Sequence, residues 1–215
     1  QTVEQVVQHY GNVVRVVCLY NPLAFHHNAM PAAELALEAH RHQGDAGFWG
    51  MHDILFQNQR SLDRASLEGY ARQGGLNMRQ VTRALDSNRH KPTIEAQQRS
   101  VTALGATGTP SFFINGRNLR GAQPFARFQT VIDEELARAR QLIQNGTPRR
   151  NIYQEAIRNG ATSQQFVNNQ AAPAAPAQQP THYAIAVPRN APRRGASNRR
   201  AQIVIQQFGD FECPF

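Results

Sequence analysis

The sequence has little cysteine, almost no lysine and no long apolar run. Its 215 residues include two cysteines, Cys18 and Cys213, which excludes a disulfide-rich scaffold and gives no zinc-ligand spacing. No apolar stretch reaches the roughly 18 residues that a membrane-spanning helix needs. No signal peptide opens the chain, and residues 1–5 resemble the interior of a helix. We therefore interpret this start as a cut within a longer protein.

The positive charge is unevenly distributed. The formal net charge is +8, and Lys91 is the single lysine among 23 basic residues. Residues 1–145 carry 15 basic and 12 acidic side chains, whereas residues 146–200 carry eight arginines and only Glu155. The excess charge thus falls in a segment rich in proline, alanine, asparagine and glutamine, which favours a solvated connector. A nucleic-acid partner is not expected, although it stays a third alternative.

The first two thirds of the chain alternate between strand and helix patterns. Residues 13–20 form an almost continuous β-branched run, typical of a strand buried on both faces. Residues 30–104 have helical spacing throughout, with Thr93 as a cap of the last helix. A short strand at residues 111–114 leads into Asn115-Gly116, a hairpin signal, and an amphipathic helix follows over residues 124–143.

The last third contains a connector and two further strand patterns. A short helix is expected within residues 147–160, and residues 171–180 read as a linker. Residues 183–187 alternate like an edge strand, and residues 201–208 form a stronger strand pattern. Together these patterns predict an α/β sheet with a helical insertion.

The chain ends in a motif that suits a reactive thiol, Cys213-Pro214-Phe215, directly after a strand. A cysteine at a helix start lies near unpaired N–H groups and the positive end of the helix dipole, which stabilise a thiolate. Proline fits the first turn of such a helix, where its missing N–H is not needed. Alone, the motif is a weak signal, and a buried or chance cysteine without a function is the more common explanation.

Several further segments resemble the DsbA-like family of bacterial disulfide oxidoreductases. They are the loop Gly108-Thr109-Pro110, the run over residues 21–34, Phe48-Trp49-Gly50 and the segment over residues 121–125. The resemblance covers about residues 1–143 and 183–215. It implies an α/β, thioredoxin-like fold with an inserted helical subdomain, in which the C-terminal segment supplies the first strands.

The resemblance also implies roles for individual residues. Cys213 is the attacking cysteine, Pro214 and Phe215 stand between the two cysteines of the family motif, and Thr109-Pro110 is the substrate-facing loop with a cis proline. The alternative for Pro110 is an ordinary trans proline. The implied substrates are proteins with thiols or disulfides, with an unidentified redox partner, no cofactor and no metal, in the bacterial periplasm or another extracytoplasmic compartment.

The order of segments departs from the family. Family members begin with the strand and cysteine motif that stand last here, so the chain resembles either a cut tandem pair or a circular permutation. We expect three parts: a thioredoxin-like domain over residues 1–145 with its insertion at about 30–104, a helix and linker over 146–182, and the strands and motif over 183–215. The terminal strand fills the central slot of the sheet, within the chain or by exchange with a second copy.

The motif also lacks its second cysteine. We therefore expect the chain to form a mixed disulfide but to turn over slowly, so a non-catalytic peptide-binding or chaperone module is the alternative function. Cys18 is expected to be a buried structural thiol, with a bridge to Cys213 as the alternative. His26, beside His27, and Glu212 are candidates for tuning the thiol, with structural roles as the alternative.

Overall fold

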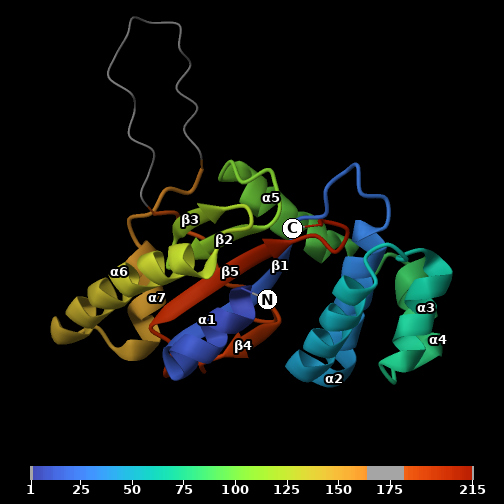
Figure 1. Ribbon diagram of the computed structural model, residues 1–215, viewed down its shortest axis with the longest axis horizontal. Coiled ribbons are helices and arrows are strands. Elements are labelled where there is room, and N and C mark those ends of the chain that lie inside the picture. Colours follow the sequence, from blue (N-terminus) through green and yellow to red (C-terminus); the bar gives the residue numbers. More distant parts are fainter. Residues whose placement is uncertain (1, 164–181, 215) are drawn as a thin grey trace, which may run out of the picture.

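The computed structural model describes residues 2–163 and 182–214 (Figure 1), so the predicted linker over residues 171–180 and Phe215 lie outside the described residues. Its centre is a five-stranded sheet with the strand order β3-β2-β5-β1-β4. The strands are β1 (Val14–Tyr20), β2 (Ser111–Ile114), β3 (Arg117–Arg120), β4 (Arg193–Gly195) and β5 (Ile203–Gly209).

The C-terminal strand β5 occupies the middle of this sheet. It pairs parallel with β1, with Val14 opposite Ile203, and antiparallel with β2, with Ile114 opposite Ile205. The segment that comes last in the sequence therefore supplies a central strand, as predicted. Strand β4 closes the far edge by antiparallel pairing with β1, and β3 closes the other edge.

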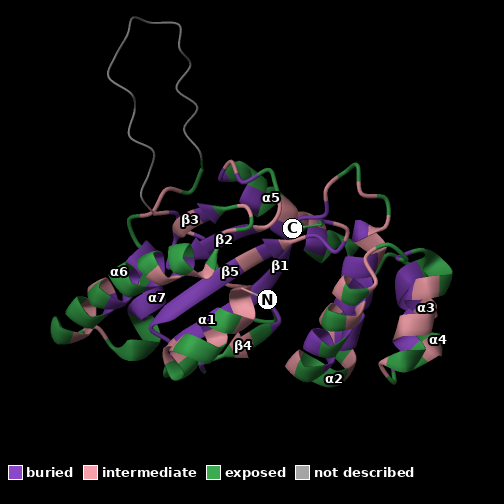
Figure 2. Ribbon diagram, in the orientation of Figure 1, coloured by how far each residue is buried: buried purple, intermediate pink, exposed green. Residues whose placement is uncertain are grey.

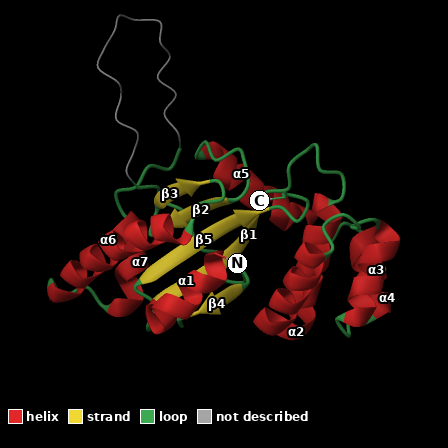
Figure 3. Cartoon of the chain, in the orientation of Figure 1, coloured by secondary structure: helices red, strands yellow, loops and turns green. Residues whose placement is uncertain are grey.

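Helices cover both faces of the sheet, and a helical subdomain stands beside it (Figure 3). Helix α2 contains a break at Gly44, whose φ of 65° and ψ of −155° are not helical; a positive φ of this kind is accessible to glycine without steric conflict. The helices are α1 (Thr2–Tyr10), α2 (Ala29–Gln57), α3 (Arg64–Gln73), α4 (Met78–Asp86), α5 (Lys91–Ala103), α6 (Phe125–Gln144) and α7 (Ile152–Ile157), with short 3-10 turns at Gly11–Val13 and Arg149–Asn151.

Two hydrophobic clusters lie on opposite faces of the sheet, and its central strands β1 and β5 are almost entirely buried (Figure 2). Along β1, Val16 and Cys18 face the cluster shared with α1, α2 and α6, whereas Val17 and Leu19 face the cluster shared with α5 and α7. All seven residues of β1 are buried, which confirms the prediction of a strand covered on both faces. Successive side chains of a strand point to opposite faces of the sheet, so a continuous apolar run places apolar side chains on both faces.

A buried carboxylate joins the helices of the insertion. Glu38 on α2 is fully buried and accepts hydrogen bonds from Arg41 at 2.7 Å, while the Nε2 atoms of His42 and His90 lie 3.0 and 2.6 Å from its oxygens. Burial alone would raise the pKa of Glu38, but the hydrogen bonds from these three side chains lower it to about 2. The charged form is therefore the one that fixes the start of α5 against α2.

Two local predictions were wrong. Residues 183–187 form no edge strand: Tyr183 makes an isolated bridge with Ala161, and the edge strand is β4 instead. The alternation of apolar and other side chains over residues 183–187 arises because Tyr183 and Ile185 are buried against α7, and not because the segment pairs as a strand. Helix α5 also begins at Lys91, two residues before Thr93, because the carboxylate of Glu34 accepts hydrogen bonds from the backbone N–H groups at its start.

Candidate functional site

The turn after β5 brings Cys213 to the loop that precedes β2. The Sγ atom of Cys213 lies 3.3 Å from the carbonyl oxygen of Thr109, to which the thiol donates a hydrogen bond. The Thr109–Pro110 peptide bond is cis. Cys213 is 5% exposed, so its sulfur lies just beneath the surface. Two segments about a hundred residues apart in the sequence thus meet at the same end of the sheet. The end of β5 lies beside the start of β2, because these two strands are antiparallel neighbours.

Asp210 holds this turn in place. One carboxylate oxygen accepts a hydrogen bond from the backbone N–H of Glu212 at 2.8 Å. The other accepts one from the N–H of Leu23 at 2.8 Å and lies 2.8 Å from Nδ1 of His26. The carbonyl of Asp210 accepts from the N–H of Cys213 at 3.2 Å. Because Asp210 is 3% exposed, these contacts replace water at a carboxylate that would otherwise be costly to bury.

The loop before α2 and the end of α2 complete the support of the turn. Glu212 accepts hydrogen bonds from the backbone N–H of Asn28 at 2.8 Å and from its side-chain amide at 3.3 Å. Gln59 donates from Nε2 to the carbonyls of Phe211 at 2.9 Å and Cys213 at 2.7 Å. The helical insertion therefore contacts the cysteine turn through side chain–backbone hydrogen bonds, which fix its conformation.

The predicted tuning residues make no hydrogen bond to the Cys213 sulfur within the described residues. His26 and Glu212 bond to the turn and the loop, and among the described residues the hydrogen-bond partner of the Cys213 thiol is Thr109. Pro214 is exposed, and neither it nor Cys213 is helical, so the expected helix start is not seen at the sulfur. Phe215 lies outside the described residues. His27 is exposed and makes no side-chain hydrogen bond to the turn within the described residues.

Cys18 lies in a different environment. It stands in the middle of β1 opposite Gln207, is 4% exposed and forms no disulfide with Cys213. Burial raises the pKa of Cys18 to about 12, so the thiol stays protonated at neutral pH. This agrees with the expectation of a structural thiol and not with the alternative of a bridge.

The described residues contain neither a metal-binding cluster nor a helix suited to cross a membrane. Within residues 2–163 and 182–214, no group of three or more histidine, cysteine, aspartate or glutamate side chains is arranged to hold a metal ion. His40 and His42, which stand two apart, bond instead to Asp45 and Glu38. No helix in this part of the chain has the length and apolar character needed to cross a membrane.

Sequence reasoning assigned no role to two of the residues that hold the turn, Asp210 and Gln59. Asp210 accepts from the N–H two residues later, an arrangement that aspartate favours at turns, so its place between a strand and the cysteine was an available signal. Gln59 gave no such signal, since it lies 154 residues from Cys213 in the sequence. Its contact with the cysteine turn arises only in the folded chain, where the insertion packs against the sheet.

The sequence matches the DSBA-like thioredoxin domain family over residues 3–133. That range includes Thr109 and Pro110 and stops before β5 and Cys213. The chain is 38% identical over 126 residues to a Na(+)/H(+) antiporter NhaA of Herminiimonas arsenicoxydans, an alignment covering 59% of this chain and 19% of that protein. It is 32% identical over 128 residues to NhaA 1 of Salinispora arenicola, with the same coverage.

The matched part is thus about a fifth of the length of these curated relatives. No solved structure matches the chain. Because the family match covers more than half of the residues and the sheet with its helical insertion is the architecture this family implies, the chain belongs to the DSBA-like thioredoxin domain family.

Proposed function

We propose that the chain carries out thiol–disulfide exchange with protein substrates and that Cys213 is its nucleophile. The observation that carries this proposal is the 3.3 Å separation between the Cys213 sulfur and the backbone of Thr109. The thiol therefore lies beside Thr109 and Pro110, the segment that resembles the substrate-facing loop of the DsbA-like family. Membership of the DSBA-like family supports the same reaction class.

The proposed reaction begins with loss of the Cys213 proton. The thiolate attacks one sulfur of a substrate disulfide, a bond forms between Cys213 Sγ and that sulfur, and the substrate S–S bond breaks. The second substrate sulfur leaves as a thiolate and takes up a proton from water. No net oxidation occurs in this step, because one disulfide replaces another.

The second step needs another thiol. The 215 residues contain no cysteine besides Cys18 and Cys213, and Cys18 is buried in the sheet with a pKa of about 12. We therefore infer that the mixed disulfide accumulates until an external thiol attacks it. Turnover of a dithiol substrate by this chain is accordingly expected to be low.

Asp210 is proposed as the main positioning residue, and it acts through the turn. Its carboxylate links the strand end, the loop at Leu23 and His26, and the backbone at Glu212. His26 and Glu212 act in the same way, by fixing the loop against the turn. A rigid turn keeps the sulfur beside Thr109, which lowers the entropy lost when an extended substrate is aligned for attack.

A dithiol turnover assay with three chains tests the proposal. The chain as it stands should give little turnover, while a variant with one cysteine added after Phe215 should gain it, because that thiol can resolve the mixed disulfide. A variant with serine added at the same place is the matched control. If the added cysteine leaves the chain inert and Cys213 forms no mixed disulfide, the redox proposal is wrong.

A non-catalytic peptide-binding module is the second candidate. The observation that favours it is the low exposure of Cys213, 5%, which restricts access by folded proteins. Such a module would bind extended peptides beside Thr109 and Pro110 through backbone hydrogen bonds. Binding of an unreactive, cysteine-free peptide with unchanged affinity in the Cys213→Ser variant would support this alternative.

The relatives suggest where the domain is located and that it is part of a longer protein. Since the aligned segment is 19% of proteins named Na(+)/H(+) antiporters, we propose that this domain works as one part of a longer protein at a membrane. An extracytoplasmic location would give it the oxidising surroundings in which disulfides persist. Accessibility of Cys213 to a membrane-impermeant thiol reagent in intact cells tests this location.

The sheet topology also supports a proposal on domains. We propose that residues 1–145 and 183–215 form one thioredoxin-like unit joined by residues 146–182, since β5 pairs with β1 and β2 of the same chain. A strand-exchanged dimer would preserve these pairs between two copies. Sedimentation velocity distinguishes the two arrangements, with a monomer favouring pairing within the chain.

A further inference from the structure

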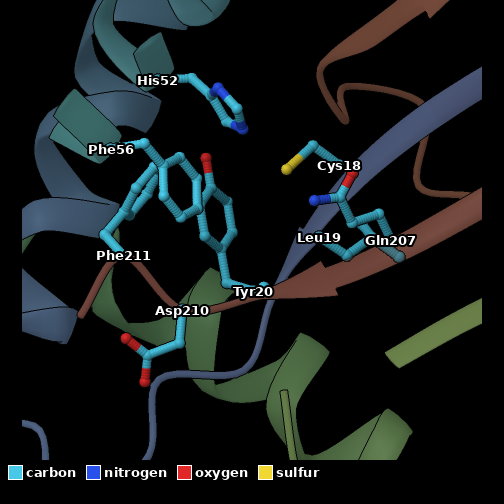
Figure 4. Close-up of a pocket in the computed structure, with 9 residues that line it drawn as sticks. Cys18, Leu19, Tyr20, His52, Phe56, Gln207, Asp210 and Phe211 are labelled. Atoms are coloured by element: carbon cyan, nitrogen blue, oxygen red, sulfur yellow. The ribbon is translucent and has the colours of Figure 1, made fainter. Parts of the chain in front are cut away.

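A small cavity lies behind the cysteine turn, between β1 and helix α2 (Figure 4). Its walls include Cys18 and Tyr20 from β1, His52 and Phe56 from α2, and Phe211 from the turn. Its volume is about 10 Å³, close to the roughly 10–15 Å³ that one water molecule requires. The cavity therefore has room for about one water molecule.

Two polar atoms in this region lack a partner. The hydroxyl of Tyr20 and Nε2 of His52 are buried, and neither has a hydrogen-bond partner among the described residues. Tyr20 is 1% exposed. In Figure 4 the Tyr20 hydroxyl, the ring nitrogen of His52 and the Cys18 sulfur point toward the same space. Buried polar atoms in native proteins are nearly always paired, with protein groups or with ordered water.

The donor and acceptor roles around the cavity are complementary. Nδ1 of His52 lies 2.9 Å from the carboxylate of Asp53, so this nitrogen carries the proton and Nε2 presents a lone pair. Burial lowers the pKa of His52 and raises the pKa of Tyr20, which keeps both side chains neutral. The cavity thus offers one O–H donor and one nitrogen acceptor, with the Cys18 sulfur as a weaker third partner.

We infer that this cavity binds one ordered water molecule, which accepts a hydrogen bond from the Tyr20 hydroxyl and donates one to Nε2 of His52. The second water hydrogen faces the Cys18 sulfur, a weak acceptor. A water with two or three polar partners in a space of this size matches the usual features of buried structural water.

The water site connects the interior to the surface. The Asp53 side chain is 55% exposed, so hydrogen bonds run from Tyr20 through the water and His52 to a solvated carboxylate. The same site joins β1 to the helical insertion directly behind Phe211, which precedes Cys213 by two residues. It therefore fixes the packing of the insertion against the sheet at the back of the cysteine turn.

High-resolution crystallography of the full chain tests the site. The expected result is a single density peak within hydrogen-bond distance of both Tyr20 Oη and His52 Nε2. That peak should weaken or disappear in Tyr20→Phe, which removes the donor but keeps the ring. It should persist in Tyr10→Phe, the matched control, because the Tyr10 hydroxyl bonds to Asp133 instead. Absence of the peak in the unmodified chain, or an unchanged peak in Tyr20→Phe, would overturn the inference.

NMR of the unmodified chain gives a test that does not depend on any variant folding. Nitrogen-15 shifts should show His52 as the neutral tautomer with the proton on Nδ1, and the ring protons should show a cross-relaxation contact to bound water. A proton on Nε2, or no water contact, contradicts the site. Neither result bears on the reactivity of Cys213.

Discussion

The two cysteines, one within strand β1 and one just after strand β5, lie in different kinds of surroundings. Cys18 is in the middle of β1, packed among apolar side chains, with a pKa that burial raises to about 12. Cys213 follows the end of β5, in a turn whose backbone N–H groups donate to Asp210 and whose carbonyls accept from Gln59, and its thiol donates to the carbonyl of Thr109. Both are nearly unexposed, so exposure alone does not distinguish them; the partners around each sulfur do.

Replacing each cysteine in turn gives the largest expected contrast. Cys213→Ser should abolish formation of a mixed disulfide with an oxidised peptide, because only this sulfur lies at a surface turn. Cys18→Ala should leave that reaction intact. Mass spectrometry under non-reducing conditions measures both. Adduct formation on Cys18 in the native Cys213→Ser variant would break the comparison.

The pH dependence of alkylation sharpens the same contrast. With a pKa of about 12, roughly one Cys18 thiol in ten thousand is ionised at pH 8, against about a quarter of unperturbed cysteines. Cys18 in folded Cys213→Ser should therefore resist iodoacetamide at pH 8 and react faster as the pH rises towards 12. The same variant unfolded in urea should react at the rate of a free thiol. Equal rates in folded and unfolded protein would contradict the assigned burial.

Asp210→Asn tests whether hydrogen bonding by a charged group holds the turn. The amide cannot accept on both sides, so one buried donor, at Leu23 or Glu212, loses its partner. We expect a loss of about 2–3 kcal/mol in the free energy of unfolding, together with slower reaction of Cys213. Urea titration and mixed-disulfide kinetics measure the two effects.

Asp86→Asn is the matched control for Asp210. Its side chain is 61% exposed and pairs with Arg64 on the surface, where such pairs contribute about 0–1 kcal/mol. Its substitution should leave the Cys213 rate unchanged. If both variants lose the same stability, the turn does not depend on Asp210 in the way described.

Gln59→Ala should give the smallest change. It removes two hydrogen bonds to the carbonyls of Phe211 and Cys213, both near the surface, and we expect a loss of about 1 kcal/mol. The exposed Gln141→Ala on α6 serves as the control. A loss as large as that in Asp210→Asn would show that the insertion, more than the strand end, holds the turn.

Local patterns predicted much of the fold. The β-branched run gave β1 to within one residue, and Asn115-Gly116 indeed forms a turn with positive φ at both positions. The amphipathic stripe located α6 to within one residue at each end. These elements follow from spacing and turn chemistry within a few residues, which is why the sequence alone was sufficient.

The supporting contacts of the site could not be predicted in this way. The partners of Asp210 and Glu212 come from the loop at Leu23 to Asn28, about 185 residues earlier in the chain. The cavity at Tyr20 and His52 forms where a strand meets a helix of the insertion. Such contacts depend on how the insertion packs against the sheet, and no short sequence pattern predicts that packing.

The central position of β5 has a consequence for synthesis of the protein. The register joins Val14 to Ile203, so this pair cannot form until 189 further residues have been translated. At about 5–20 residues per second, that delay is roughly 10–40 seconds. Until β5 is made, β1 lacks the parallel partner it has in this structure, and β2, once synthesised, lacks its antiparallel partner; such open strand edges readily pair with other chains. The pairing that completes the centre of this sheet therefore forms late in synthesis.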